Sequence, residues 1–293
     1  MVEPLDAALA KEKLSPGHAF PGFERCELGT TSMVARAALA DAFVRVLEQH
    51  QTLYAWAREQ EQPTALRGRA PVYVATLPTA PTAPTAPTVN VAVRHSWHGG
   101  LLAPITSDRF LRPTRAPLEL RVSIQLREFK IPTPEVLAFA LYNAGPFAVR
   151  VDVATRYIAN AFDFSVVLKG VAPTIDRAEA VAAVETLLVQ LAACGFTHPD
   201  LNVKNILLYR DHQQLIAAVL DVDVMQWRDQ VTPATTMLAN VSRLARSMQK
   251  AERQFGIALA DSDLSAFVER MLGATPPSAL PPAVASRITT SNR

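Results

Sequence analysis

The spacing of hydrophobic positions along the chain changes from helical to strand-like and then back to helical. A helical period over residues 32–47 gives way to short apolar runs typical of strands, and the helical period returns after residue 176. The predicted strands are residues 68–77, 89–95, 136–141 and 148–153, and the predicted helices are residues 32–47, 116–128, 176–194, 232–258 and 262–272. This order predicts an α+β fold with an antiparallel sheet.

These changes divide the chain into four predicted parts. Residues 1–63 are expected to form a helical N-terminal extension, in which Thr31 or Ser32 caps the helix. Residues 64–160 hold most strands and residues 161–273 most helices, while residues 274–293, rich in Pro, Ser and Thr, are expected to be disordered. Within the second part, residues 78–88 repeat Pro, Thr and Ala, which predicts an exposed insert at a hairpin tip.

The composition favours a soluble protein with a substantial core. Of the 293 residues 49% are apolar, and the formal net charge is only +2, so no nucleic-acid partner is expected. The first residues lack the features of a signal peptide, and no apolar run approaches the roughly 18 residues that span a bilayer. Two cysteines make no disulfide framework, which favours a cytoplasmic location.

The most informative segment is residues 198–223, HPDLNVKNILLYRDHQQLIAAVLDVD. It contains an H-x-D-x-x-x-x-N loop, two apolar strands joined by a polar turn at 210–214, and an aspartate after the second strand. Kinase-like enzymes use this layout to hold a catalytic carboxylate and two metal ligands around the γ-phosphate of ATP. Asp200 is therefore the candidate catalytic base.

Asn205 and Asp221 are the candidate ligands of Mg²⁺, a cation that prefers oxygen ligands. Folding the two strands into a hairpin should bring these residues side by side. A plainer interpretation is that Asp200 and Asn205 cap the loop and Asp221 forms a turn at the strand end.

Several motifs together resemble the lipopolysaccharide kinase family, in particular its Kdo kinases. They are Gly68-Arg69 before a strand, V-R-H-x-W-x-G-G-L-L at residues 93–102, D-R-F-L at 108–111, R-A-x-x-E at 115–119, H-x-D-L-N-x-x-N-I-L-L at 198–208, D-x-D at 221–223, and N-x-x-R-L-x-R-S at 240–247. The resemblance covers residues 50 to 255. It implies a protein-kinase-like two-lobed fold, with a small antiparallel-sheet N-lobe and a mainly helical C-lobe.

The resemblance also implies roles for further residues. Gly68 and Arg69 would lie at the ATP phosphates, and Arg94 would take the place of the lysine that contacts phosphate in ordinary kinases, with Glu119 as its ion-pair partner. His198 would support the loop by hydrogen-bonding to backbone. Asp223 would support the metal site or cap the turn that follows. Arg94 as a solvated strand residue and Glu119 as a helix-surface charge remain alternatives.

A member of this family would use ATP and Mg²⁺ to phosphorylate a sugar hydroxyl of lipopolysaccharide, namely the 4-hydroxyl of Kdo on a lipid A precursor. It would be cytoplasmic and peripheral on the cytoplasmic face of the inner membrane, where anionic lipid attracts basic residues. Two basic clusters could contact such a surface or could simply be solvated: Arg109, Arg112, Arg115 and Arg121, and Arg243, Arg246, Lys250 and Arg253.

Two other functions fit the same residues. The acceptor could be another core sugar, such as heptose, or a small-molecule alcohol, because the motif defines the phosphate donor better than the acceptor. The chain could also be a non-catalytic pseudokinase, since its phosphate loop offers Gly68 alone where close backbone approach favours a second glycine.

Overall fold

A computed structural model describes residues 20–60, 64–66, 71–80, 87–97, 108–228, 231–255 and 261–273. The described residues form two compact units, which we treat separately. The sheet unit comprises the described residues up to 125 and residues 134–158, and the helical unit comprises residues 126–133 and those from 159 onward. Gly68 and Arg69, most of the Pro/Thr/Ala insert and the tail after residue 273 lie outside the described residues.

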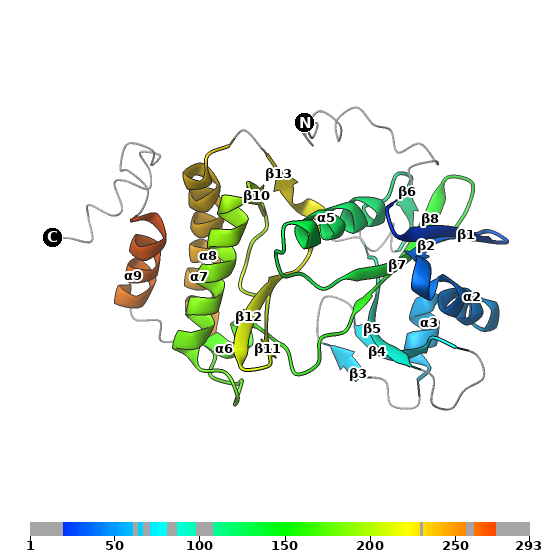
Figure 1. The fold of residues 1–293 in the computed structure, drawn as a ribbon, viewed down its shortest axis with the longest axis horizontal. Helices are drawn as coiled ribbons and strands as arrows, with labels where there is room; N and C mark the ends of the chain where they lie inside the picture. The colour runs from blue at the N-terminus through cyan, green and yellow to red at the C-terminus, as the bar shows by residue number, and fades with distance from the viewer. Residues whose placement is uncertain are drawn as a thin grey trace. The chain divides into compact units, whose positions relative to one another are not determined.

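In the described part of the sheet unit, the strands form one antiparallel sheet in the order β1-β2-β7-β8-β5-β4-β3, with β6 paired to β8 (Figure 1). The strands are β1 (Phe23–Leu28), β2 (Thr31–Arg36), β3 (Thr64–Leu66), β4 (Val72–Pro78), β5 (Thr88–His95), β6 (Phe110–Leu111), β7 (Val136–Asn143) and β8 (Ala148–Arg156). Pro78 pairs with Thr88, so the predicted insert does connect the two strands of a hairpin.

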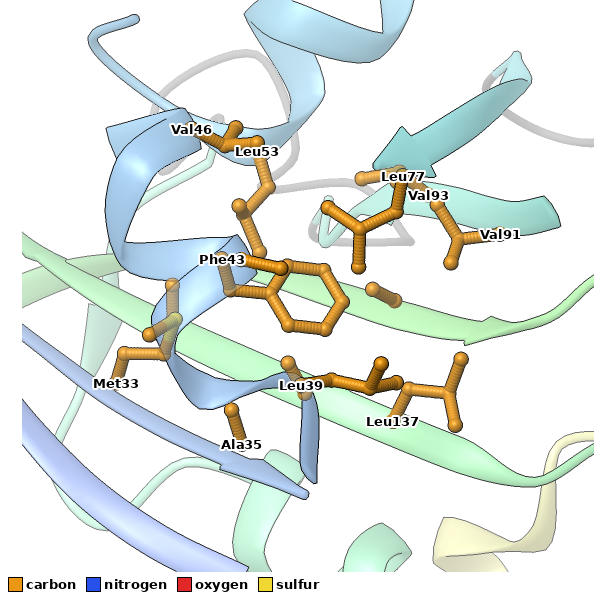
Figure 2. Close-up of a cluster of buried hydrophobic side chains, with 14 of the residues drawn as sticks. Met33, Ala35, Leu39, Phe43, Val46, Leu53, Leu77, Val91, Val93 and Leu137 are labelled. Carbon is orange, nitrogen blue, oxygen red and sulfur yellow. The ribbon is translucent and has the colours of Figure 1, made fainter. Parts of the chain in front are cut away.

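Helices cover both faces of this sheet. On one face, η1 (Ala37–Leu39), α2 (Ala40–Gln49) and α3 (Leu53–Arg58) bury the cluster in Figure 2, in which Phe43 of α2 lies among Leu39, Leu77 and Leu137. On the other face, α5 (Ala116–Glu128) packs through Ala116 and Leu120. Both faces of the central strands are therefore buried, which explains their continuous apolar runs.

The predicted helix over residues 32–47 begins later than expected, and residues 31–36 form β2 instead. Met33 and Ala35 are fully buried and alternate with Ser32 and Arg36, which is the period of a strand with one face on the core. Neither Thr31 nor Ser32 caps a helix, because β2 pairs with β1 on one side and β7 on the other. Residues 23–36 thus belong to the sheet, and α2 and α3 pack on it, so the described part of residues 1–63 is not a separate helical extension.

The helical unit contains the helices α6 (Phe164–Leu168), α7 (Arg177–Ala193), α8 (Pro233–Phe255) and α9 (Asp261–Leu272). Helices α7 and α8 pack side by side, and α9 packs on α8 (Figure 1). Asp176 caps α7, since its carboxylate accepts from the backbone N–H groups of Ala178 and Glu179. Gly195 ends this helix with φ +73°, and a Cβ there would meet the Arg228 carbonyl oxygen at 2.3 Å.

Short strands complete the helical unit: β9 (Phe162–Asp163), β10 (Phe196–Thr197), β11 (Ile206–Asp211), β12 (Gln214–Val219) and β13 (Gln226–Trp227). The β11–β12 hairpin was predicted, but its turn is tighter than residues 210–214, because Asp211 already pairs with Gln214. Arg210 of this hairpin donates two hydrogen bonds to Glu179 of α7, at 2.8 and 2.6 Å. The hairpin is therefore tied to the first turn of α7.

The α+β prediction is confirmed, with antiparallel sheet in the N-terminal part and mainly helices in the C-terminal part. In the described part of the chain, no helix is both long and apolar enough to cross a membrane.

Candidate active site

The loop that carries Asp200 is anchored by two polar side chains of α8. Asn240, which is almost fully buried, accepts from the backbone N–H of His198 at 3.0 Å and donates to the carbonyl oxygen of Phe196 at 2.9 Å. Farther along the loop, the hydroxyl of Ser247 accepts from the N–H of Val203 at 3.1 Å. One helix therefore satisfies backbone groups at both ends of the loop, and a rigid element sets its conformation.

The imidazole of His198 joins this loop to the segment before Asp221. Its Nε2 donates to the carbonyl oxygen of Leu220 at 2.9 Å, and its Nδ1 accepts from the backbone N–H of Asp200 at 3.2 Å. These partners require the tautomer with the proton on Nε2. Burial lowers the pKa of His198, and the Leu220 carbonyl and nearby carboxylates offset only part of that effect. The ring is thus a neutral structural bridge, in line with the backbone-bonding role expected from the sequence.

Asn205 and Asp221 come together at the open end of the β11–β12 hairpin. The N–H of Leu220 donates to the carbonyl oxygen of Asn205 at 2.9 Å, so Asp221 follows directly after the residue paired with Asn205. The Nδ2 of Asn205 donates to the carbonyl oxygen of Asp200 at 3.0 Å, which leaves its Oδ1 as the atom available to a ligand. The hairpin thus produces the juxtaposition that the sequence predicted.

Asp221 has a left-handed backbone conformation, with φ 53° and ψ 48°. This region is costly for most residues that carry a Cβ, although aspartate tolerates it better than most. The chain turns sharply there into η2 (Val222–Val224), and the exposed carboxylate lies at the turn. Asp223 lies in this short helix and is partly buried.

The side-chain oxygens of Asn205 and Asp221 suit Mg²⁺ better than they suit a metal ion whose ligands all come from the protein. Among the described residues, no three His, Cys, Asp or Glu side chains gather closely enough to hold a metal ion. Mg²⁺ is usually bound through one or two carboxylates together with waters and substrate phosphates. The carboxylate of Asp221 and the amide oxygen of Asn205 supply such a set.

The carboxylate of Asp200 has a partner that sequence reasoning placed elsewhere. Nη2 of Arg243, on α8, lies 2.6 Å from Oδ1 of Asp200, and the two side chains are 40% and 55% exposed. Arg243 was assigned to a basic helix face that could contact lipid. Its spacing of three residues from Asn240 was the available signal, because residues at i and i+3 lie on one side of a helix.

In the sheet unit, Arg94 of β5 forms the predicted ion pair with Glu119 of α5, through Nη2 and Oε2. The Glu119 side chain is only 8% exposed, whereas that of Arg94 is 32% exposed. A buried carboxylate needs a cation, so this pair argues against both residues being independent surface charges. The guanidinium of Arg94 is partly exposed, and arginine is a side chain suited to phosphate oxygens.

A buried charge network beside Arg94 was not anticipated from the sequence. Asp152 of β8, fully buried, accepts from the backbone N–H of Tyr54 at 2.9 Å and contacts Nδ1 of His95 at 2.6 Å. Nε2 of His95 lies 3.3 Å from Asp108, whose carboxylate also pairs with Arg150 at 2.7 Å. The network fixes the residue next to Arg94 on β5.

Comparisons with known proteins agree with these motifs. The model of the Lipopolysaccharide kinase (Kdo/WaaP) family matches residues 81–270. A 3-deoxy-D-manno-octulosonic acid kinase of Actinobacillus succinogenes is 30% identical over 186 residues, which cover 60% of this chain and 72% of that protein. Proteins of the same name from Haemophilus influenzae and Vibrio vulnificus are 29% and 27% identical, and the matches cover 69% and 73% of this chain and 81% and 84% of theirs.

A solved structure of WaaP in complex with acyl carrier protein aligns with 73% of this chain and 80% of its own, with 16% identity and a TM-score of 0.42. The family match is the stronger finding, because it spans more than half of the chain and includes the loop, the hairpin and Arg243. The chain therefore belongs to the lipopolysaccharide kinase (Kdo/WaaP) family.

Proposed function

We propose that this chain, a lipopolysaccharide sugar kinase by its family, transfers the γ-phosphate of ATP to the 4-hydroxyl of Kdo on a lipid A precursor and requires Mg²⁺. The observation that carries the proposal is the bonding of one loop to one hairpin. His198 bridges Asp200 and Leu220, while Asn205 bonds to the backbone of Asp200, so three residues with kinase chemistry share one rigid frame.

Asp200 would act as the base that receives or orients the proton of the acceptor hydroxyl. Its carboxylate is exposed enough to meet a substrate, and Arg243 holds one of its oxygens at 2.6 Å. A base must come within hydrogen-bond reach of the proton that it removes, and a fixed rotamer helps it to do so.

Asn205 and Asp221 would hold Mg²⁺, and Asp223 would support that site. When bound, the metal would neutralise charge that develops on the transferred phosphoryl group. The left-handed turn at Asp221 fits this role, because strained backbone in folded proteins is concentrated at ligand-binding positions.

Arg94 would contact the phosphates of ATP, with Glu119 holding its guanidinium. An arginine can bind phosphate oxygens through two parallel N–H groups, so it can replace a lysine without loss of charge. Gly68 and Arg69 would complete the phosphate contacts. The acceptor is a membrane lipid, so we propose that the protein works peripherally on the cytoplasmic face of the inner membrane.

The test is transfer of labelled phosphate from ATP to lipid A precursors with and without Kdo. We expect label only on lipid that carries Kdo, and only when Mg²⁺ is present. Asp200→Asn should reduce the rate by on the order of 10²–10⁴, which is the usual contribution of a general base. Asp211→Asn, which removes an exposed carboxylate at the tip of the same hairpin, is the matched control and should retain full activity.

Three outcomes would contradict the proposal. Equal rates for the wild type and Asp200→Asn would remove Asp200 from the chemistry. Label on a precursor without Kdo would point to another acceptor. Nucleotide binding without transfer, in both proteins, would favour a pseudokinase.

A further inference from the structure

One face of α8 carries a row of cations that begins at the candidate catalytic base. The row consists of Arg243, Arg246, Lys250 and Arg253. At 3.6 residues per turn, these positions fall within an arc of about 80°, and the row is about 15 Å long. Its first member, Arg243, contacts Asp200.

The rest of the row is cationic and exposed. Arg246, Lys250 and Arg253 are solvent-exposed, and no carboxylate among the described residues forms an ion pair with any of them. The Nε of Arg246 donates to the Ser242 carbonyl at 3.1 Å, which leaves its other guanidinium N–H groups for a ligand. Glu252, the acidic residue in this part of α8, lies on the opposite side of the helix, because it is nine positions after Arg243.

A shallow hollow of about 440 Å³ lies along the same residues. It is lined by Arg246, Gln249, Lys250, Arg253 and Gln254. All five side chains end in N–H donors, and none of them carries a negative charge. A surface of this kind suits a ligand that offers several anionic oxygens.

We propose that this row, from Arg246 to Arg253, docks the anionic headgroup of the glycolipid acceptor while the lipid remains in a bilayer. The inference rests on the proposed function, because a lipid A precursor is the reason to expect an anionic, membrane-bound acceptor beside Asp200. A headgroup held along the row would keep its anionic groups within about 15 Å of the base. Formal net charge is only +2, so the attraction would come from this row and not from the chain as a whole.

Charge and length both favour a lipid surface as the occupant. Basic residues near an anionic bilayer each strengthen binding by roughly fivefold, and long Lys and Arg side chains can reach the headgroups while their helix stays outside. Three unpaired cations on one helix face therefore predict a contribution of about 100-fold to membrane binding.

The experiment measures sedimentation of the full chain with phosphatidylcholine vesicles, with and without a Kdo-bearing lipid A precursor. The test variant is Arg246→Gln/Lys250→Gln/Arg253→Gln, which leaves Arg243 and the loop intact. The matched control, Arg58→Gln/Arg127→Gln/Lys130→Gln, removes the same charge from exposed positions on other elements. We expect only the test variant to lose binding to anionic vesicles, by about 100-fold.

Kinetics supply a second readout. The test variant should show a raised KM for the lipid acceptor, with an unchanged KM for ATP and a near-normal kcat, since the row binds lipid and takes no part in the transfer. An unchanged KM for ATP also shows that the variant is folded. Loss of kcat together with a normal acceptor KM would contradict docking.

Further measurements distinguish binding to lipid headgroups from binding to free phosphate. Millimolar inorganic phosphate should not displace the wild type beyond the effect of chloride at equal ionic strength, and displacement by phosphate would overturn the assignment to lipid. Equal retention of wild type and test variant would also overturn it. If no lipid is phosphorylated yet the test variant alone loses vesicle binding, the proposed function fails and the docking surface stands.

Discussion

At the scale of single residues, the candidate base is oriented by a side chain from far along the sequence. The Asp200–Arg243 pair is exposed at both ends, and exposed ion pairs contribute little to folding stability. A charge-assisted hydrogen bond of 2.6 Å nevertheless restricts the carboxylate to one arrangement. Arg243 is therefore better understood as a positioning residue for Asp200 than as a stabilising one.

We predict that Arg243→Ala lowers kcat by roughly 10- to 100-fold, the equivalent of one hydrogen bond to a charged group. The free energy of unfolding should change by less than about 1 kcal/mol. Arg243→Lys should recover part of the rate, because it restores the charge but not the planar geometry. Steady-state kinetics and urea unfolding measure the two effects, and a variant with full kcat would exclude the positioning role.

Which site residues could be predicted depended on how local their contacts are. His198, Asp200 and Asn205 lie on one loop, and the hairpin that brings Asp221 back is encoded by adjacent apolar runs and a polar turn. The contacts of Asn240, Arg243 and Ser247 with that loop depend on how α8 packs. Such tertiary packing leaves only a weak trace in sequence, namely the spacing of polar residues on one helix face.

At the scale of elements, the His95–Asp152 contact ties β5 to β8 and α3. His95 lies between Asp152 and Asp108, while Arg150 balances part of their charge. Burial on its own lowers the pKa of His95, but the hydrogen bonds and charges of Asp152 and Asp108 outweigh it, so the pKa is raised above its usual value. The imidazolium form is thus favoured in the folded sheet unit.

The raised pKa of His95 determines how the stability of the protein changes with pH. Because the folded-state pKa of His95 exceeds the unfolded one, its stabilising contribution is complete below about pH 6.5 and is lost as the pH rises through the folded value. We predict that His95→Gln destabilises the protein by about 3–5 kcal/mol at pH 6, since Asp152 then keeps a buried charge without its partner.

The difference between wild type and His95→Gln should shrink between pH 6 and pH 9. Chemical denaturation at both pH values measures it. His212→Gln, at the exposed tip of the β11–β12 hairpin, is the control and should show no such difference. A constant difference across this range would mean that the charge on His95 is not what stabilises the network.

The same scale shows why the predicted start of one helix was wrong. Residues 32–47 satisfy a helical period through Val34, Leu39, Phe43 and Leu47, but Met33 and Ala35 satisfy a period of two at the same time. Pairing with both β1 and β7 decides between them, and those partners lie outside any local window. In contrast, α5 and α7 were predicted almost to the residue, and the Asp176 cap marks where α7 begins.

At the scale of the whole molecule, the described residues divide into two compact units. The sheet unit has its own hydrophobic clusters on the two faces of its sheet. The helical unit has the candidate metal ligands and the candidate base, held by α7, α8 and the β11–β12 hairpin. A nucleotide that binds only the folded protein should stabilise it against heat. If Mg²⁺ takes part in nucleotide binding, the Mg²⁺-dependent share of this stabilisation requires the candidate ligands in the helical unit.

We predict that Mg²⁺ with ATP, at a concentration 100 times its Kd, stabilises the chain by about 2.7 kcal/mol. That free energy corresponds to a rise of roughly 5–10 °C in the midpoint of thermal unfolding for a protein of this size. Asp221→Asn should lose most of the rise, as should the wild type in EDTA. Asparagine tolerates the left-handed conformation of residue 221, so backbone strain would not explain such a loss.

Scanning calorimetry measures the midpoint, with Asp211→Asn as the control that keeps the full rise. A rise that survives both EDTA and Asp221→Asn would show that nucleotide binds without metal at this position, because the ligand oxygen and the ion would each have been removed without effect.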